Sequence, residues 1–234
     1  MVVSSPALSE VTGWPIGFWA SELTHPLAAF TEAGYMVDLA STQGGAVSMD
    51  GYSNPTDASG FSAHDVLTLG YLHHPPFNEM LANTTPIAEV DATAYAAIFL
   101  VGGQGPMYTF TQNPDLERLF CAFYEAGKPC AAVCHASAFL LTARTSAGAL
   151  VVDGKTWTGF SDAEEDVTEQ AVGSKVQPFR IETEARKLPG TQFKTEAAFT
   201  GFAIRDGNLI TGQQQNSGTA AAACVLEALA EMND

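Results

Sequence analysis

The sequence has little positive charge. Among its 234 residues, Lys and Arg total 10 and Asp and Glu total 26, which gives a formal net charge of −16. Proteins bind nucleic acids and anionic membrane surfaces largely through basic side chains, so this balance argues against both as partners. Only 15% of the residues are charged and 46% are hydrophobic. A disordered acidic chain lacks that apolar share, so we expect a folded protein with a sizeable core.

Cysteine and long apolar runs are also scarce. The four cysteines, Cys121, Cys130, Cys134 and Cys224, are too few for a disulfide scaffold of this length. No CxxC pair occurs, and although Cys130 and Cys134 are four residues apart, no second Cys/His pair with zinc spacing lies near them, so we expect no metal. No apolar run reaches the roughly 18 residues of a membrane span. The first residues lack the pattern of a secretory signal peptide, and we therefore expect a reduced, cytoplasmic protein.

What the sequence does contain is an alternation of apolar strand-like and helical segments, which is typical of an α/β fold. We expect one domain over 1–234, with strands at 2–4, 35–40, 96–101 and 129–133. Helices are expected at 21–33, 115–126, 179–187 and 217–231, and a hairpin at 202–211 with a type I′ turn at Asp206–Gly207. The predicted fold is a flavodoxin-like, doubly wound, mostly parallel sheet flanked by helices. Residues 44–77 form a small cap or insertion that partly covers the site.

Cys134 is placed where a nucleophile would be expected. The apolar strand at 129–133 runs directly into it, and small residues follow. A sharp turn from a buried strand into a helix presents its central residue at the edge of the sheet, as in the nucleophile elbow of hydrolases. The helix N-terminus favours the reactive thiolate. The alternative is a buried, inert cysteine, which is how we interpret Cys121, Cys130 and Cys224.

Two neighbouring features could support such a thiol. His135 follows it directly, so its imidazole could act as general base and its backbone N–H as an oxyanion donor. Gly102 and Gly103 end the apolar strand at 96–101, at the edge of the sheet where ligands bind in doubly wound folds. Backbone N–H groups freed there could supply a second donor. The alternatives are a packing histidine and an ordinary turn.

Four sequence motifs together resemble the ThiJ/PfpI superfamily, which is related to the class I glutamine amidotransferases. These are VGGQGPM at 101–107, AVCH at 132–135, TGFSD at 158–162 and LITGQ at 209–213. The segment GFWASELTHP at 17–26 also resembles the first helix of the superfamily's heat-shock branch. Members of that branch are described as glutathione-independent glyoxalases (glyoxalase III), protein deglycases and holding chaperones. The resemblance covers nearly the whole chain.

The resemblance implies a role for individual residues. Cys134 matches the nucleophile, His135 its neighbouring histidine, Glu22 the first-helix carboxylate beside the thiol, and Glu165 the acid that orients the histidine. Asp162 and Glu164 are the reserve candidates for that last role. The resemblance also implies a group of oxyanion and substrate-binding residues, namely Gly103, Gly102, Gln104, Asp162 and the amide of His135.

Two positions depart from the pattern of the heat-shock branch. Gln104 stands where a histidine usually follows the paired glycines, and glutamine forms hydrogen bonds but does not titrate. Ala136 and Ser137 stand where the branch often has Gly-Pro.

The function implied is a glyoxalase III-like lyase of the D-lactate dehydratase type. It would convert methylglyoxal-type 2-oxoaldehydes to 2-hydroxy acids such as lactate through Cys134, without cofactor, with possible deglycase activity and a possible homodimer. One alternative is an amidase or protease-like hydrolase with the same Cys-His-acid set. Another is a non-enzymatic stress chaperone or redox sensor, which requires an exposed apolar surface, for example around Phe18, Trp19 and Tyr71.

Overall fold

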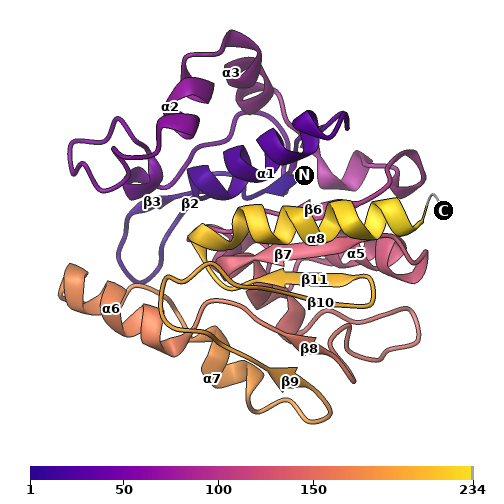
Figure 1. Cartoon of the computed structure of the whole chain (residues 1–234). Coiled ribbons are helices and arrows are strands. Elements are labelled where there is room, and N and C mark those ends of the chain that lie inside the picture. The colour runs from indigo at the N-terminus through magenta and orange to yellow at the C-terminus, as the bar shows by residue number, and fades with distance from the viewer. Residues whose placement is uncertain (233–234) are drawn as a thin grey trace.

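A central sheet organises the structure, a computed structural model that describes residues 1–232 (Figure 1). Within those residues the sheet has seven strands in the order β10-β11-β7-β6-β1-β4-β5, all parallel except β10. Their bounds in that order are Ala203–Asp206, Leu209–Gly212, Cys130–Val133, Ile98–Leu100, Val2–Val3, Ala40–Ser41 and Thr85–Pro86. Two small ribbons lie outside the sheet. They pair β2 (Ala7–Leu8) with β3 (Pro15–Ile16) and β8 (Thr156–Trp157) with β9 (Gln192–Phe193).

Both faces of the sheet are covered. Every residue of β6, β7 and β11 is buried, and successive residues of a strand point to opposite faces. Helix α8 (Gly218–Glu231) packs against β7, β10 and β11 and lies beside α1 (Ala20–Glu32), as Figure 1 shows. Helix α5 (Pro114–Glu125) also packs against β7. The predicted doubly wound α/β fold is confirmed.

The remaining helices are short. The α-helices are α2 (Val66–Leu72), α3 (Pro75–Ala82), α4 (Pro106–Thr109), α6 (Asp162–Val172) and α7 (Ile181–Ala185). The 3₁₀ helices are η1 (Gly51–Ser53), η2 (Ile87–Glu89), η3 (Ala92–Ala94), η4 (Cys134–Leu141) and η5 (Gln215–Ser217). Among residues 1–232, no helix combines the length and the apolar character that a bilayer span requires.

Side-chain caps fix the starts of two helices near the sheet. The Asn113 carboxamide accepts the backbone N–H groups of Asp115 and Leu116 at the start of α5. Ser161 and Glu164 form a reciprocal capping box at the start of α6. These caps satisfy N–H groups that have no partner within the helix.

Several predicted elements differ from the structure. The strand predicted at 35–40 is reduced to Ala40–Ser41, because the chain crosses the surface before it enters the sheet; Met36 is 98% exposed. The segment 44–77 contains η1, α2 and the start of α3. The segment after Cys134 forms a 3₁₀ helix, and the helix predicted at 179–187 spans only α7. The hairpin turn lies at Gly207–Asn208, with a positive φ at Gly207 alone, so it matches type II′ rather than I′.

Replacement of Phe120 tests the core packing next to the segment that carries Cys134. Its ring is fully buried, and it meets the ring of Phe139, five residues after Cys134, edge to face at 5.2 Å. We expect Phe120→Ala to lower the free energy of unfolding by about 3–5 kcal/mol, because it removes buried area and leaves a cavity. Urea unfolding measures the change. Met36→Ala is the control and should change stability by less than about 0.5 kcal/mol. Equal effects of the two substitutions would contradict this placement of the core.

Candidate active site

Cys134 occupies a sharp turn between β7 and η4. Its φ is +58°, in the left-handed region that non-glycine residues rarely adopt, and its side chain is only 3% exposed. The Ser137 hydroxyl donates a hydrogen bond of 2.6 Å to the Cys134 carbonyl oxygen and so closes the turn. The elbow predicted from the sequence is therefore present, and it presents the thiol at the carboxyl edge of the sheet.

His135 links the thiol to a buried carboxylate. Its Nδ1 lies 3.4 Å from the Cys134 Sγ, and its Nε2 lies 2.9 Å from Oε1 of Glu165, whose side chain is 1% exposed. The Phe160 ring stacks on the imidazole, with 4.1 Å between ring centroids. A carboxylate on Nε2 places the ring proton there and leaves the Nδ1 lone pair facing the sulfur. The three side chains form a Cys-His-acid line.

Glu22 reaches the thiol from the first turn of α1. Its side chain is fully buried, one carboxyl oxygen accepts the Gly102 N–H at 2.9 Å, and the carboxyl group lies beside the Cys134 thiol, where its second oxygen has no hydrogen-bond partner. Burial raises the pKa of Glu22 well above its ordinary value, so the site favours the protonated form of this carboxyl group. The Trp19 N–H donates to the Gly102 carbonyl oxygen at 2.9 Å, which fixes the start of α1 beside the thiol.

Burial also raises the pKa of the Cys134 thiol, and ionised Glu22 would raise it further. The backbone N–H groups of His135 and Gly103 are directed at the sulfur and lower the thiol pKa. A protonated Glu22 does not oppose the thiolate, and its hydroxyl can donate to the sulfur. The site therefore holds one negative charge beside these donors more readily than it holds two.

The paired glycines permit this close approach. A Cβ at Gly102 would clash with the Glu22 carboxyl group and would lie 2.8 Å from Cβ of Cys134. Gly103 has a φ of +112°, and a Cβ there would clash with the backbone of Phe18 and Trp19. Only glycine fits either position, and the turn thereby directs the Gly103 N–H at the sulfur.

Asp50 is a residue of the site that sequence reasoning missed. It lies in the 44–77 segment, is 1% exposed, and accepts two backbone N–H groups through its carboxylate: that of Gly17 at 2.9 Å and that of Gln104 at 2.7 Å. It therefore ties this segment to the turn that carries Gly103. Burial raises the pKa of Asp50 from 3.8 to about 6. No local sequence pattern around Asp50 distinguished it from the other acidic residues in loops.

The two reserve acids lie elsewhere. Glu164 is fully buried and accepts the N–H groups of Ser161 and Phe199, both at 2.9 Å. It thereby holds Phe199, whose φ is +59°. Asp162 accepts the Thr183 hydroxyl at 2.6 Å and does not line the cavity over the thiol. Of the three acids, Glu165 is the one that contacts His135.

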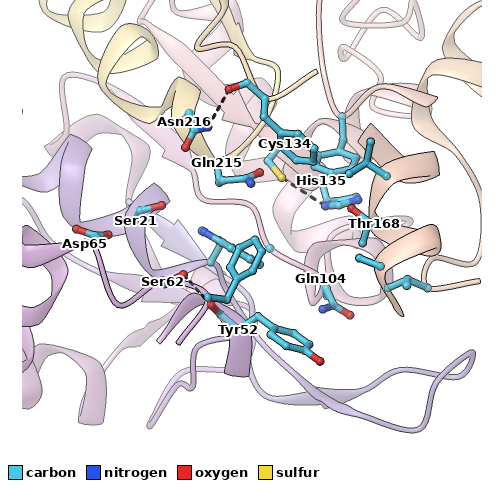
Figure 2. Close-up of a pocket in the computed structure, with 18 of the residues that line it drawn as sticks. Ser21, Tyr52, Ser62, Asp65, Gln104, Cys134, His135, Thr168, Gln215 and Asn216 are labelled. Carbon is cyan, nitrogen blue, oxygen red and sulfur yellow. Dashed lines mark hydrogen bonds between the residues drawn. The ribbon is translucent and has the colours of Figure 1, made fainter. Parts of the chain in front are cut away.

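A cavity of about 940 Å³ opens above Cys134 and His135, as Figure 2 shows. Gln104 lines it, and the buried Oε1 of this side chain has no hydrogen-bond partner. His25 and His64 line it as well. Within residues 1–232, no group of three or more His, Cys, Asp or Glu side chains is placed to hold a metal ion.

This geometry accompanies a family match over most of the chain. Residues 16–228 match the model of the DJ-1/PfpI family. The chain belongs to the DJ-1/PfpI family. The resemblance inferred from the sequence motifs is therefore confirmed.

Two similar proteins have names that state an activity. The chain is 26% identical to "Glyoxalase 3" of Candida albicans, over 92% of this chain and 91% of that protein. It is 27% identical to "Glutathione-independent glyoxalase HSP31" of Saccharomyces cerevisiae, over 93% of this chain and 91% of that protein. Among solved structures, the Rapid Encystment Protein 24 kDa of Francisella tularensis superposes with a TM-score of 0.86 at 25% identity, covering 98% of this chain and 97% of that one.

The raised pKa of Asp50 predicts a measurable pH dependence of stability. The folded state holds the Asp50 proton up to about pH 6, whereas the ordinary pKa of the group is 3.8. Its contribution is therefore fully present below about pH 4 and is lost as the pH rises through 6. Relative to Asp50→Asn, the wild-type free energy of unfolding should fall by roughly 2 kcal/mol between pH 4 and 6.5.

Urea unfolding at a series of pH values tests this expectation. The quantity compared is the change in the free energy of unfolding with pH, not its absolute value. Glu10→Gln, at an exposed acid away from the site, is the control and should keep the wild-type pH dependence. Parallel curves for wild type and Asp50→Asn would contradict the expectation.

Proposed function

We propose that the protein is a glutathione-independent glyoxalase, which converts a 2-oxoaldehyde such as methylglyoxal to a 2-hydroxy acid through Cys134. The observation that carries the proposal is the set of groups around one buried sulfur. His135 with its carboxylate Glu165, the protonated carboxyl group of Glu22 and two backbone N–H groups all reach it. The names of the two yeast relatives support the same activity.

The first step is addition of the thiol to the aldehyde. His135 Nδ1 takes the thiol proton, and the Glu165 carboxylate stabilises the imidazolium that forms. The sulfur bonds to the aldehyde carbon, and the carbonyl electron pair moves onto its oxygen. The N–H groups of Gly103 and His135 stabilise that oxyanion. The imidazolium then returns its proton to this oxygen, which gives a neutral hemithioacetal.

The second step moves a hydrogen between the two carbons and requires both a base and an acid. His135 removes the proton from the hemithioacetal carbon while Glu22 donates its proton to the ketone oxygen, which gives an enediol. His135 then delivers its proton to the second carbon, and Glu22 takes back a proton from the first hydroxyl group. The product is a 2-hydroxy thioester, and both side chains return to their starting states.

Water completes the reaction. Assisted by His135, it adds to the thioester carbonyl, and the same backbone donors stabilise the tetrahedral oxyanion. The C–S bond breaks, the sulfur recovers a proton, and the 2-hydroxy acid leaves. The net change adds one water molecule to the 2-oxoaldehyde and involves no net oxidation.

Two features argue against the alternative functions weighed from the sequence. A simple amidase does not need a second, protonated carboxyl group at the sulfur, whereas hydrogen transfer between two carbons does. The chaperone hypothesis looked to an apolar surface around Phe18, Trp19 and Tyr71, but Phe18 is fully buried and the other two are only partly exposed.

Replacement of the thiol tests the covalent mechanism. We expect Cys134→Ala to form no lactate from methylglyoxal above the uncatalysed rate, because no carbon–sulfur bond can form. Cys224→Ala, which removes a half-buried thiol from α8, is the control and should retain wild-type activity. Enzymatic lactate determination measures both. Turnover by Cys134→Ala would rule out the mechanism, and a thioester that accumulates from an ester or amide would favour the hydrolase.

Replacement of Glu22 tests the hydrogen transfer. Glu22→Gln keeps an oxygen to accept the Gly102 N–H but cannot give up and regain a proton. We expect kcat to fall by about 10²- to 10⁴-fold with little change in KM. The rate of Cys134 alkylation by iodoacetamide should stay within a few-fold of wild type. A kcat near the wild-type value would show that Glu22 carries no proton in the reaction.

A further inference from the structure

The cavity over Cys134 is large for methylglyoxal. Its volume of about 940 Å³ lies near the upper end of the range for drug-sized ligands. Methylglyoxal has only a few non-hydrogen atoms, and the thiol, the imidazole and the turn at Gly103 contact one end of the cavity. Most of the enclosed space therefore surrounds whatever substituent the 2-oxoaldehyde carries on its ketone carbon.

Aromatic rings form two walls of this space. On one side, Trp14 meets Tyr52, Tyr52 meets Phe61, and Phe61 meets Trp19, with ring centroids about 6 Å apart at each contact. On the other side, Phe160 stacks on His135 and meets Phe199 at 6.5 Å. Figure 2 shows Tyr52 on the far side of the cavity from His135. Such rings bind flat apolar groups by burial and by edge or face contacts.

The described walls carry no fixed positive charge for an anion. None of the described residues that line the cavity is Lys or Arg. The one carboxylate among them, Asp65, accepts hydrogen bonds from the Thr68 backbone and is paired with His25. With a formal net charge of −16, the protein as a whole also repels anions. A substituent bearing a carboxylate or phosphate would meet no fixed positive charge here to offset its desolvation.

The apolar lining continues to the surface. Phe61, Val66 and Val167 line the cavity and are 56%, 76% and 48% exposed, respectively. They come from the segment before α2, from α2 and from α6, which Figure 1 places at one end of the molecule. Exposed apolar side chains at the mouth of a site can contact a long or branched group that the interior does not fully enclose.

We propose that the substrates are 2-oxoaldehydes with a bulky, uncharged, aromatic or branched apolar substituent, rather than methylglyoxal itself. This inference rests on the proposed glyoxalase function. The reacting carbons would lie at Cys134, and the substituent would lie between the two aromatic walls and extend toward α6. The hydrogen transfer is unchanged, and the product is the matching 2-hydroxy acid.

The test compares three substrates with the purified protein. These are methylglyoxal, phenylglyoxal and phenylglyoxal with a carboxylate on the ring. We expect kcat/KM for phenylglyoxal to exceed that for methylglyoxal by at least about tenfold, and the carboxylate to reduce it by at least about tenfold. A kcat/KM for methylglyoxal that equals or exceeds that for phenylglyoxal would overturn the substrate assignment and leave the glyoxalase function standing.

A pair of variants separates the cavity from intrinsic aldehyde reactivity. Ala171 and Gln170 are both exposed residues of α6, but only Ala171 lines the cavity, so Ala171→Trp narrows the space and Gln170→Trp is the matched control. We expect Ala171→Trp to lower the ratio of phenylglyoxal to methylglyoxal kcat/KM by at least about tenfold, and Gln170→Trp to leave both values unchanged. An unaltered ratio in Ala171→Trp would contradict the proposal.

A binding measurement tests the cavity independently of turnover. Trp14 and Trp19 line it, so a bound ligand should change tryptophan fluorescence. We expect acetophenone, an uncharged aromatic ketone, to titrate this signal in wild type and to bind at least about tenfold more weakly to Ala171→Trp. If neither aldehyde is turned over but acetophenone still binds this way, the glyoxalase proposal fails and the apolar specificity stands. No saturable change with acetophenone would refute the apolar specificity.

Discussion

The site depends on a thiol and a carboxylic acid that are buried in contact with each other. Glu22 and Cys134 lie side by side with almost no solvent exposure, and two adjacent negative charges in such a place are strongly disfavoured. The pair therefore keeps at least one proton at neutral pH. This constraint supplies the nucleophile of the proposed addition step and the acid of the proposed hydrogen transfer, because the carboxyl group can act as an acid while the sulfur is a nucleophile. It also explains Gly102, since any side chain there would separate the two groups.

The buried acids also explain how an irregular turn is held in place. Asp50 binds the N–H groups of Gly17 and Gln104, and Glu164 binds that of Phe199. Each of these N–H groups belongs to a segment outside the regular ladders of the sheet, where backbone donors need other partners. A carboxylate makes stronger hydrogen bonds to such donors than a neutral oxygen does. Part of the acidity of the chain is thus structural, and it fixes the backbone that carries the oxyanion donors and one aromatic wall.

Features formed by contiguous residues were predicted from the sequence more readily than features formed by residues far apart in the chain. The elbow at Cys134 was readable because a buried strand, the thiol and His135 are contiguous. Glu22 and Glu165 lie far away in sequence, and the family resemblance alone singled them out. Asp50 and the aromatic wall from Tyr52 and Phe61 were not predicted, because nothing periodic in the 44–77 segment shows which side chains turn toward the sheet. The strand predicted at 35–40 was mostly wrong for a related reason, since apolar residues there cover the surface next to Phe30 instead of joining the ladder.

The acidic composition and the apolar cavity have a common consequence for specificity. The described residues that line the cavity include no Lys or Arg, so no fixed positive charge attracts an anionic substrate, and an anionic product is repelled by the same surroundings. A neutral 2-oxoaldehyde enters an apolar cavity readily, whereas the 2-hydroxy acid formed from it is ionised at neutral pH. Hydrolysis of the thioester therefore converts a group that the cavity accepts into one that it disfavours. In this arrangement the chemistry itself promotes product release, and the net negative charge of the chain favours turnover without taking part in the bond-making steps.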